Sequence, residues 1–552
     1  MTGYSQLVEA QRIFKSLLQD QNLPVPEEFK SLAQDVSFYN NSDSLVLPCR
    51  LKECEMAAAL KGLEATAAIG IANLRYGVND DAKIDLQHAL MFLFLTYLAS
   101  VDGMTKLDKR VVSRLKQTDI NEAQSITYRR MSANLYKTKD ERYYHIHGSL
   151  EASTTLNMIG LPAYAPELTE YEDVIKVIQG AVSKLDCDDL EALNTQNRQA
   201  GIEALTEEQF LETKHGKVIL KEPYWTIESM EQETPPVAFT PCSTGTDKPK
   251  ILEGIKILEL CRIIAGPTIG RILAEYGAEV IKVTSPNLPD VPFFQVDVNV
   301  GKHTTSLDLK NEQDRETFEA LLRDTDVILD GYRTNAIERL GYGPSKIAEM
   351  AKSRKKGYIY GSENCFGFNG QWADRAGWQQ IADCASGVAW IHGKSLGLDE
   401  PLIPPFPMSD YGTGCMVAIA VLTAIYKRAR YGGSYWCKSS LMQYDLLLLK
   451  QRLYPDDLWK ESLTKHDKEI FNLRYCDSVD KISSTCLRSM KRIKPELFDD
   501  TVSEKKYMEE MDAPAFKGKI KVLKPVVEYS STSVGFDGPS RPNGYDKPEW
   551  WK

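Results

Sequence analysis

The stretch GIKILELCRIIAGPTIGRILAEYGAEVIKV, residues 254–283, contains the pattern that decides the fold. Ile255–Leu260 is an apolar run of strand length, Pro267 is suited to the first turn of a helix, and Gly277 is suited to ending one. Val280–Val283 is a second short apolar run. The order strand, helix, strand predicts a parallel sheet with helical crossovers.

Two more strand-like segments extend this pattern. TDVILDGY at 325–332 and KGYIYGSENCFGF at 356–368 each follow a helical segment. A GxGxxG motif is absent, so the sequence does not support a dinucleotide site of that type. We expect an α/β fold built on a Rossmann-like parallel sheet.

Composition narrows the class of protein. With 552 residues the chain is too long for one hydrophobic core, and two or three domains are expected. A net charge of −10 argues against a general nucleic-acid binder. Eleven cysteines without a CxxC pair indicate reduced thiols and no metal site. No signal peptide is visible, and the longest apolar stretch, Ala89–Val101, is too short to span a bilayer. The expectation is a cytoplasmic protein that binds no membrane.

The sequence also suggests a division into domains. A segment rich in Pro, Thr and Ser, Gln232–Lys250, is the best linker in the chain. The predicted parts are a first half at 1–235 with a small α/β domain at about 136–225, a linker at 236–253, a Rossmann-like domain at 254–451, and a helical region with a closing tail at 452–552.

An internal repeat is visible in outline. Ala67–Leu93 and Ala418–Leu449 each contain a helix of small residues, a Gly-containing turn, a short strand and an apolar helix. We interpret them as parts of two related halves in one chain, of which the first is degenerate.

Asp410 stands out in PPFPMSDYGTGC, residues 404–415. A helix beginning just after it places its carboxylate at the positive end of the helix dipole, which favours the ionised form that a nucleophile requires. The N–H groups of Gly412 and Gly414 are unhindered and suited to an oxyanion. Asp before a helix is also a common cap, and local sequence alone favours that interpretation.

Six blocks in order resemble the family III CoA-transferases, the CaiB/BaiF family. The blocks are GIKILELCRIIAGP (254–267), LAEYGAEVIKV (273–283), GKHTTSLDLK (301–310), VILDGYRTNAIERLGYG (327–343), FGFNGQWADRAGWQQIADCASG (366–387) and SDYGTG (409–414). In the first half, TKDERYYHIHGSLEASTTLNMIG at 138–160 is similar to the family's small domain. The chain therefore resembles a double-length subgroup of this family.

The resemblance implies a mechanism and a set of site residues. Asp410 would attack an acyl-CoA thioester, form an anhydride and then a bound CoA thioester, and pass CoA to a carboxylic acid. Coenzyme A is thus expected as part of the substrate, and no metal is implied. The positions that match the family's CoA contacts are Ile263, Ile264, Leu307, Lys310, Arg339 and Trp378.

Trp378 also bears on the reaction. It stands where racemases of the same family carry the His of a GHD motif, and an indole cannot shuttle a proton, so a two-base racemase is not expected. Two alternatives stay open: Asp410 as acid or base in an isomerisation, elimination, cyclisation or decarboxylation, and a degenerate member without catalysis.

Family members form interlocked dimers in which a partner's small domain covers the site. Two halves in one chain are expected to supply both sides as an internal pseudo-dimer, with a further homodimer left open.

Overall fold

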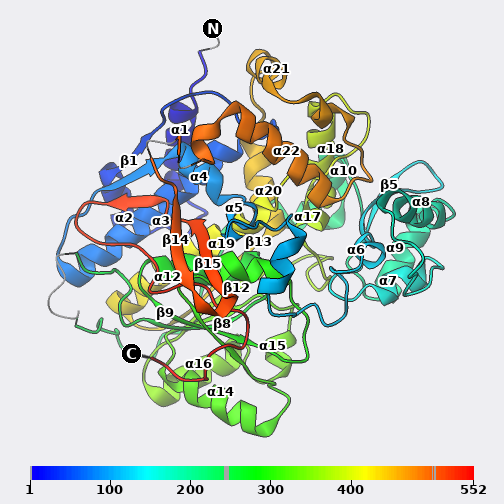
Figure 1. The fold of residues 1–552 in the computed structure, drawn as a ribbon. Coiled ribbons are helices and arrows are strands. Elements are labelled where there is room, and N and C mark those ends of the chain that lie inside the picture. The colour runs from blue at the N-terminus through cyan, green and yellow to red at the C-terminus, as the bar shows by residue number, and fades with distance from the viewer. Residues whose placement is uncertain (1–2, 242–247, 500, 503–504, 552) are drawn as a thin grey trace.

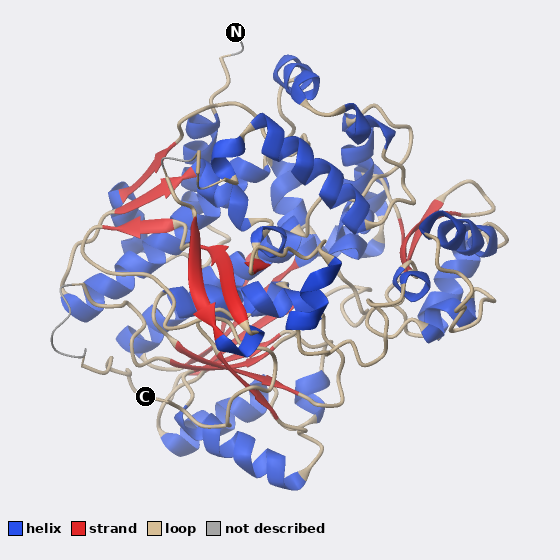
Figure 2. Ribbon diagram, viewed as in Figure 1, coloured by secondary structure: helices blue, strands red, loops and turns tan. Residues whose placement is uncertain are grey.

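Seven strands form the central sheet of the protein (Figures 1 and 2). A computed structural model describes residues 3–241, 248–499, 501–502 and 505–551. The strands are β7 (Trp225–Glu231), β8 (Lys256–Leu260), β9 (Glu279–Thr284), β10 (His303–Ser306), β11 (Val327–Asp330), β12 (Ile359–Asn364) and β13 (Ser434–Ser440). Six run parallel, and β7 pairs antiparallel with β13 at the edge.

The strand order locates the crevice of the sheet. The order is β10-β9-β8-β11-β12-β13-β7, so the chain moves outward in one direction from β8 and in the other from β11. This is the order of doubly wound sheets, in which ligands bind beyond the carboxyl ends of the two central strands. The predicted parallel α/β sheet is confirmed.

Helices cover both faces of this sheet (Figure 1). Alternate residues of a strand point to opposite faces, so Leu258 joins one hydrophobic core and Ile257 the other. The main covering helices are α12 (Ala265–Glu275) and α19 (Met408–Tyr431) on the Ile257 face, and α14 (Glu312–Asp324) and α16 (Pro344–Arg354) on the Leu258 face.

Helix α19 packs against a helix of the first half, α3 (Glu53–Tyr76). Each helix has 24 residues. After α3 come β2 (Ala82–Asp85) and α4 (Leu86–Phe92), and after α19 come β13 and α20 (Leu441–Lys450). The order of elements agrees with the predicted repeat; a common origin of the two halves stays a prediction.

One of the described helices, α19, is long and apolar enough to cross a membrane. It lies almost entirely inside the fold, as core helices do.

A small sheet with its own core lies at one side of the molecule (Figure 1, cyan). Residues between Tyr128 and Leu190 form this core. Its elements are β4 (Ala133–Lys137), β5 (Tyr143–His147), β6 (Ile202–Glu203), α7 (Ser153–Met158), α8 (Tyr171–Val182) and α9 (Cys187–Gln196).

Two further sheets join the ends of the chain. In the first, β1 (Val36–Tyr39) and β2 pair with β16 (Val527–Tyr529). In the second, β3 (Ser100–Val101) pairs with β15 (Gly518–Leu523), which pairs with β14 (Met508–Ala513). Backbone pairing therefore crosses the predicted boundaries near 235 and 451.

The remaining α-helices surround these sheets. They are α1 (Gln6–Gln19), α2 (Glu27–Leu32), α5 (Leu95–Leu98), α6 (Thr127–Arg130), α10 (Glu207–Glu212), α11 (Lys214–Ile219), α13 (Gln295–Val298), α15 (Ala336–Arg339), α17 (Gln379–Ser386), α18 (Val388–Ser395), α21 (Asp456–Lys465) and α22 (Val479–Ile493).

Candidate active site

Asp410 lies in the first turn of α19, where two cavities meet. The helix begins at Met408 after Pro407, so the predicted start just after Asp410 is wrong, and Asp410 is not the cap. Burial raises the pKa of Asp410 to about 8. Because desolvation favours the protonated acid, the helix N-terminus does not keep this carboxyl ionised at low pH as the sequence suggested.

Glu363, in β12, places a second carboxyl group in the larger cavity. Burial, followed by repulsion from Asp410 and Asp330, raises the pKa of Glu363 to about 8. Its carboxylate accepts a hydrogen bond from the N–H of Gly266. A Cβ at Gly331 would lie 2.7 Å from Oε1 of Glu363, so a side chain at that position would displace the Glu363 carboxyl group. Asp410 and Glu363 therefore form a repelling pair that retains a proton near neutral pH.

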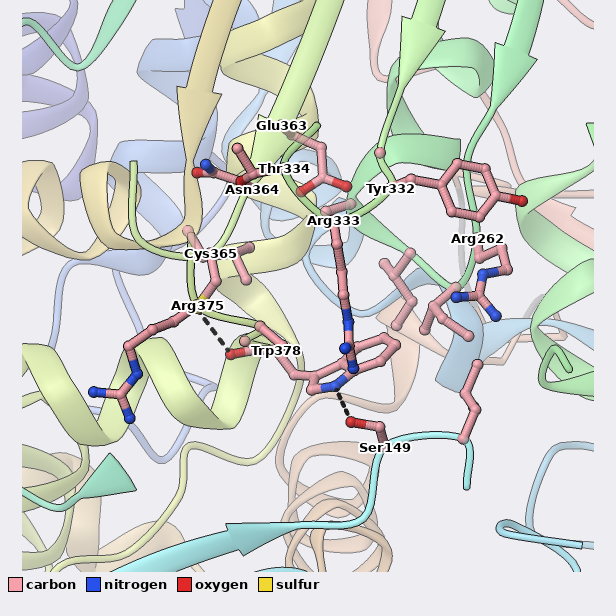
Figure 3. A pocket seen from close by; sticks show the side chains of 18 of the residues that line it. Ser149, Arg262, Tyr332, Arg333, Thr334, Glu363, Asn364, Cys365, Arg375 and Trp378 are labelled. Atoms are coloured by element: carbon pink, nitrogen blue, oxygen red, sulfur yellow. Dashed lines mark hydrogen bonds between the residues drawn. The ribbon is translucent and has the colours of Figure 1, made fainter. Parts of the chain in front are cut away.

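The larger cavity has a volume of about 370 Å³ and is lined by both parts of the chain. One wall comes from the loops after β8, β11 and β12, the crevice expected from the strand order. The opposite wall comes from the small domain, through Ser149 (Figure 3), Glu151 and Gln199. A single chain thus supplies both sides of the site, as the pseudo-dimer hypothesis requires.

Two arginines in this cavity lack an acidic partner. Arg262 follows β8, and its Nη1 donates to the carbonyl of Pro289 at 2.8 Å. Burial, followed by repulsion from Arg262, lowers the pKa of Arg333. Within the described part of the chain neither forms a salt bridge, whereas Arg375 in the same cavity pairs with Glu191 at 2.7 Å. Two adjacent guanidinium groups without a salt bridge are chemically suited to a phosphorylated anion.

Three of the predicted CoA contacts surround Asp410. Ile263, Ile264 and Trp378 line both cavities that meet there. Ile263 has a φ of 70°, a conformation that a β-branched residue rarely adopts and that often occurs at functional sites. The indole N–H of Trp378 donates to Oγ of Ser149 at 2.9 Å (Figure 3), and its ring stacks on His147 at 5.5 Å. The small domain therefore fixes Trp378 beside Asp410.

The other three predicted contacts lie in a neighbouring cavity. Leu307, Lys310 and Arg339 line a cavity of about 470 Å³ beyond the ends of β9 and β10. It shares Leu288 and Tyr332 with the larger of the two cavities that meet at Asp410. The structure thus divides the predicted contacts into two adjoining cavities, an arrangement that suits one elongated ligand.

The predicted role of Gly412 and Gly414 does not agree with their positions. Both lie inside α19, where amide N–H groups bond to carbonyls one turn earlier, and neither lines either cavity at Asp410. A Cβ at Gly412 would lie 1.9 Å from the ring of Tyr444, and one at Gly414 would lie 2.8 Å from the carbonyl of Ala265. These glycines allow close packing of the helix and are not placed to stabilise an oxyanion.

The first half contains a position equivalent to Asp410 in the repeat. Glu55 is the third residue of α3, as Asp410 is of α19. Its carboxylate accepts hydrogen bonds from Tyr4 at 2.9 Å and Tyr454 at 2.6 Å. The cavity beside Tyr454 measures about 10 Å³, so this place is filled by side chains.

Sequence analysis missed Glu363, Arg262 and Arg333. None belongs to a periodic pattern, but each lies at or just beyond the carboxyl end of a predicted strand. The rule that ligands bind at these ends of a parallel sheet was the available signal.

Comparison with known proteins identifies the family. The model of CoA-transferase family III matches residues 252–473. The acetyl-coenzyme A transferase nodX of Hypoxylon pulicicidum is 31% identical over 561 residues, which cover 98% of this chain and 93% of that protein. The chain belongs to CoA-transferase family III. It is thus an enzyme of the family that its sequence motifs resemble.

Two further matches are a second fungal relative and a solved structure. An acyl-CoA transferase of Gibberella moniliformis is 30% identical to this family III chain over 510 residues, 91% of this chain and 88% of that protein. The crystal structure of Rv3272 from M. tuberculosis has a TM-score of 0.42 and 20% identity, and covers 54% of this chain and 98% of that one.

Proposed function

We propose that this enzyme transfers CoA from an acyl-CoA to a carboxylic acid, with Asp410 as the nucleophile. The observation that carries the proposal is that the Asp410 carboxylate lines both cavities, one of which contains two unpaired arginines. The names of the two fungal relatives, acetyl-coenzyme A transferase and acyl-CoA transferase, support the same class of reaction.

The two adjoining cavities suit the parts of CoA. Arg262 and Arg333 would hold phosphate oxygens of the diphosphate, since neither forms a salt bridge with a described residue. The neighbouring cavity has apolar walls that include Leu307 and Ile337, which suit a flat base, and Lys310 at its edge suits a phosphate. Leu288 and Tyr332 would lie where the ligand passes from one cavity to the other.

The proposed reaction begins at the thioester carbon. The Asp410 carboxylate attacks it, the C–S bond breaks, and CoA leaves as a thiolate, so that a mixed anhydride forms. The thiolate attacks the aspartyl carbonyl of this anhydride, which releases the first acid and leaves Asp410 as a CoA thioester. The acceptor carboxylate attacks the carbonyl of that thioester, the C–S bond breaks to release the CoA thiolate, and a second mixed anhydride forms. The thiolate attacks the acceptor's carbonyl carbon in this anhydride, which gives the new acyl-CoA and releases the Asp410 carboxylate.

The proposed nucleophile needs one ionised carboxylate beside Glu363. Because two neighbouring buried carboxyls resist simultaneous ionisation, a proton held by Glu363 allows Asp410 to be the charged member. Its raised pKa also makes the Asp410 carboxylate a stronger nucleophile once it has lost its proton.

Asp410→Asn and Asp410→Ala test the proposal. Both variants should lose transfer from acetyl-CoA to a panel of acids by more than about a thousandfold, since no covalent intermediate can form. Mass spectrometry of wild type mixed with acetyl-CoA should show an adduct on the peptide that contains Asp410, and hydroxylamine should remove it. Undiminished turnover by either variant, in protein with a wild-type unfolding temperature, would overturn the assignment.

Glu363 favours one alternative reaction. Two carboxyls with raised pKa values in one cavity can act as acid and base on an acyl-CoA without transfer. This alternative predicts deuterium incorporation at the α-carbon of an acyl-CoA in D₂O without any acceptor acid. Transfer without such incorporation excludes it.

A further inference from the structure

The smaller of the two cavities at Asp410 has a volume of about 120 Å³. It shares Asp410 and Trp378 with the larger cavity and then extends away from Arg262 and Arg333. A volume below the roughly 300 Å³ at the low end of drug-sized pockets suits a small acid and not a nucleotide. The two cavities therefore meet at Asp410, and neither Arg262 nor Arg333 is among the lining residues of the smaller one.

Two cations line this smaller cavity, Lys106 and Arg130. Both form ion pairs with a single carboxylate, Asp480. The side chain of Lys106 is 9% exposed, and its Nζ lies 4.8 Å from the ring centre of Tyr97 and 5.2 Å from that of Phe294. The side chain of Arg130 is 31% exposed and that of Asp480 is 20% exposed, so the cluster is partly shielded from water. Two positive charges therefore share one counter-ion, which leaves an excess of one positive charge.

Apart from Asp410, the described lining residues carry no charge that could neutralise this excess. Gln124, Gln379, Gln380 and Ser478 are uncharged, and burial lowers the pKa of His147 to about 3, so it is neutral as well. Asp410 is the one acid among the described lining residues of this cavity. A ligand that fits must therefore present a group that reacts at Asp410 and an anion that reaches the cations.

We propose that this cavity binds the acceptor acid and selects acids that carry a second anionic group, a second carboxylate in the simplest case. The reacting carboxylate lies at Asp410, and the distal one pairs with Lys106 and Arg130 beside Asp480. This inference rests on the proposed CoA transfer, because it assigns the acceptor of that reaction. Ionic contacts to these partly buried cations favour the dicarboxylic acid over a monocarboxylic acid of equal length.

Matched acids test the selection. With acetyl-CoA as donor, succinate should exceed butyrate, and glutarate should exceed valerate, by about tenfold or more in kcat/KM, in line with one good charge pair. Lys106→Met and Arg130→Gln should each raise the KM for succinate about tenfold and change the KM for butyrate by a much smaller factor. Arg130→Lys should keep the preference because it keeps the charge. Lys460→Met, an exposed cation on α21, serves as the charge-matched control.

Binding separates the two hypotheses. Succinate and glutarate should raise the unfolding temperature of wild type more than that of Lys106→Met. Transfer without preference between the matched acids overturns the acceptor site and leaves the proposed function intact. If succinate binds specifically but no CoA transfer occurs, the anion site stands, and both the proposed function and the acceptor role that rests on it are refuted. If neither binding nor transfer is seen, the anion site and the proposed function are both refuted.

Discussion

The carboxyl groups of Asp410 and Glu363 share one cavity, and the charge of Asp410 helps to raise the pKa of Glu363 to about 8. One comes from the first turn of a core helix and the other from the end of a central strand. This pairing makes both stability and activity depend on pH in ways that can be measured.

Activity should rise with pH as Asp410 loses its proton. Since burial raises its pKa to about 8, kcat/KM should increase between about pH 6 and 8 with a slope near one in logarithmic form. Initial rates with acetyl-CoA across this range provide the measurement. Glu363→Gln should keep the same rise of kcat/KM with pH, because burial is the cause of the raised pKa of Asp410. A flat pH profile in wild type would contradict the assignment of Asp410 as the nucleophile.

Stability should change in the opposite direction. The folded pKa of Asp410, about 8, exceeds its ordinary value of 3.8, so between these values the folded state holds a proton that the unfolded state has lost. Stability therefore falls as pH rises through this window. The free energy of unfolding of Asp410→Asn should exceed that of wild type by about 1 kcal/mol at pH 8.5 and equal it near pH 4. The figure is smaller than the full pKa shift would give, because Asp410 borders a cavity where solvent screens its charge.

Unfolding midpoints at both pH values test this expectation. Glu316→Gln, an exposed acid on α14, is the control and should leave the pH dependence as it is in wild type. Equal destabilisation by Asp410→Asn at both pH values would show that the buried acid does not favour its protonated form.

Gly412 should be essential for folding and not only for activity. In Gly412→Ala the new Cβ would lie 1.9 Å from the ring of Tyr444, which cannot move freely because it is buried and bonded to Glu53. We expect a loss of about 1–3 kcal/mol in the free energy of unfolding, as for other overpacked cores. Gly180→Ala on α8, with no atom within 4 Å of the new Cβ, should not destabilise. Similar denaturant midpoints for the two variants would contradict the packing role.

Arg333 should contribute to the binding of acyl-CoA and not of the acceptor. Arg333→Gln removes one of two unpaired guanidinium groups and should raise the KM for acetyl-CoA about tenfold, with the KM for the acid unchanged. Lys176→Gln, an exposed cation on α8, controls for net charge. Steady-state kinetics with each substrate varied in turn provide the measurement. An equal rise in the KM values for acetyl-CoA and for the acid would refute a specific phosphate contact.

The first crossover could be predicted closely from sequence because its signals are local. The expected strands at 255–260 and 280–283 correspond to β8 and β9, and Gly277 ends the helix region with a φ of 93°. The edge strand β7 and the pairing of β16 with β2 could not be predicted, because such contacts join residues far apart in the chain. No short-range pattern encodes them.

The site shows the same division. Motif resemblance brought Ile263, Ile264 and Trp378 to Asp410, where the structure places them. Local sequence gave Gly412 a chemical role because a glycine near an acid suggests an open backbone, whereas the ring of Tyr444 occupies that space. Only the three-dimensional arrangement separates a glycine that admits a ligand from one that admits a side chain.

Strand β7 has a consequence for any attempt to divide the protein. It precedes the predicted linker, yet it covers the edge of β13, and β15 and β16 from the tail complete sheets begun by β3 and β2. A truncated protein that starts at residue 254 would expose the backbone of β13, which invites aggregation. A split version of this enzyme would therefore have to be co-expressed as two pieces that fold around each other, like the subunits of an obligate heterodimer.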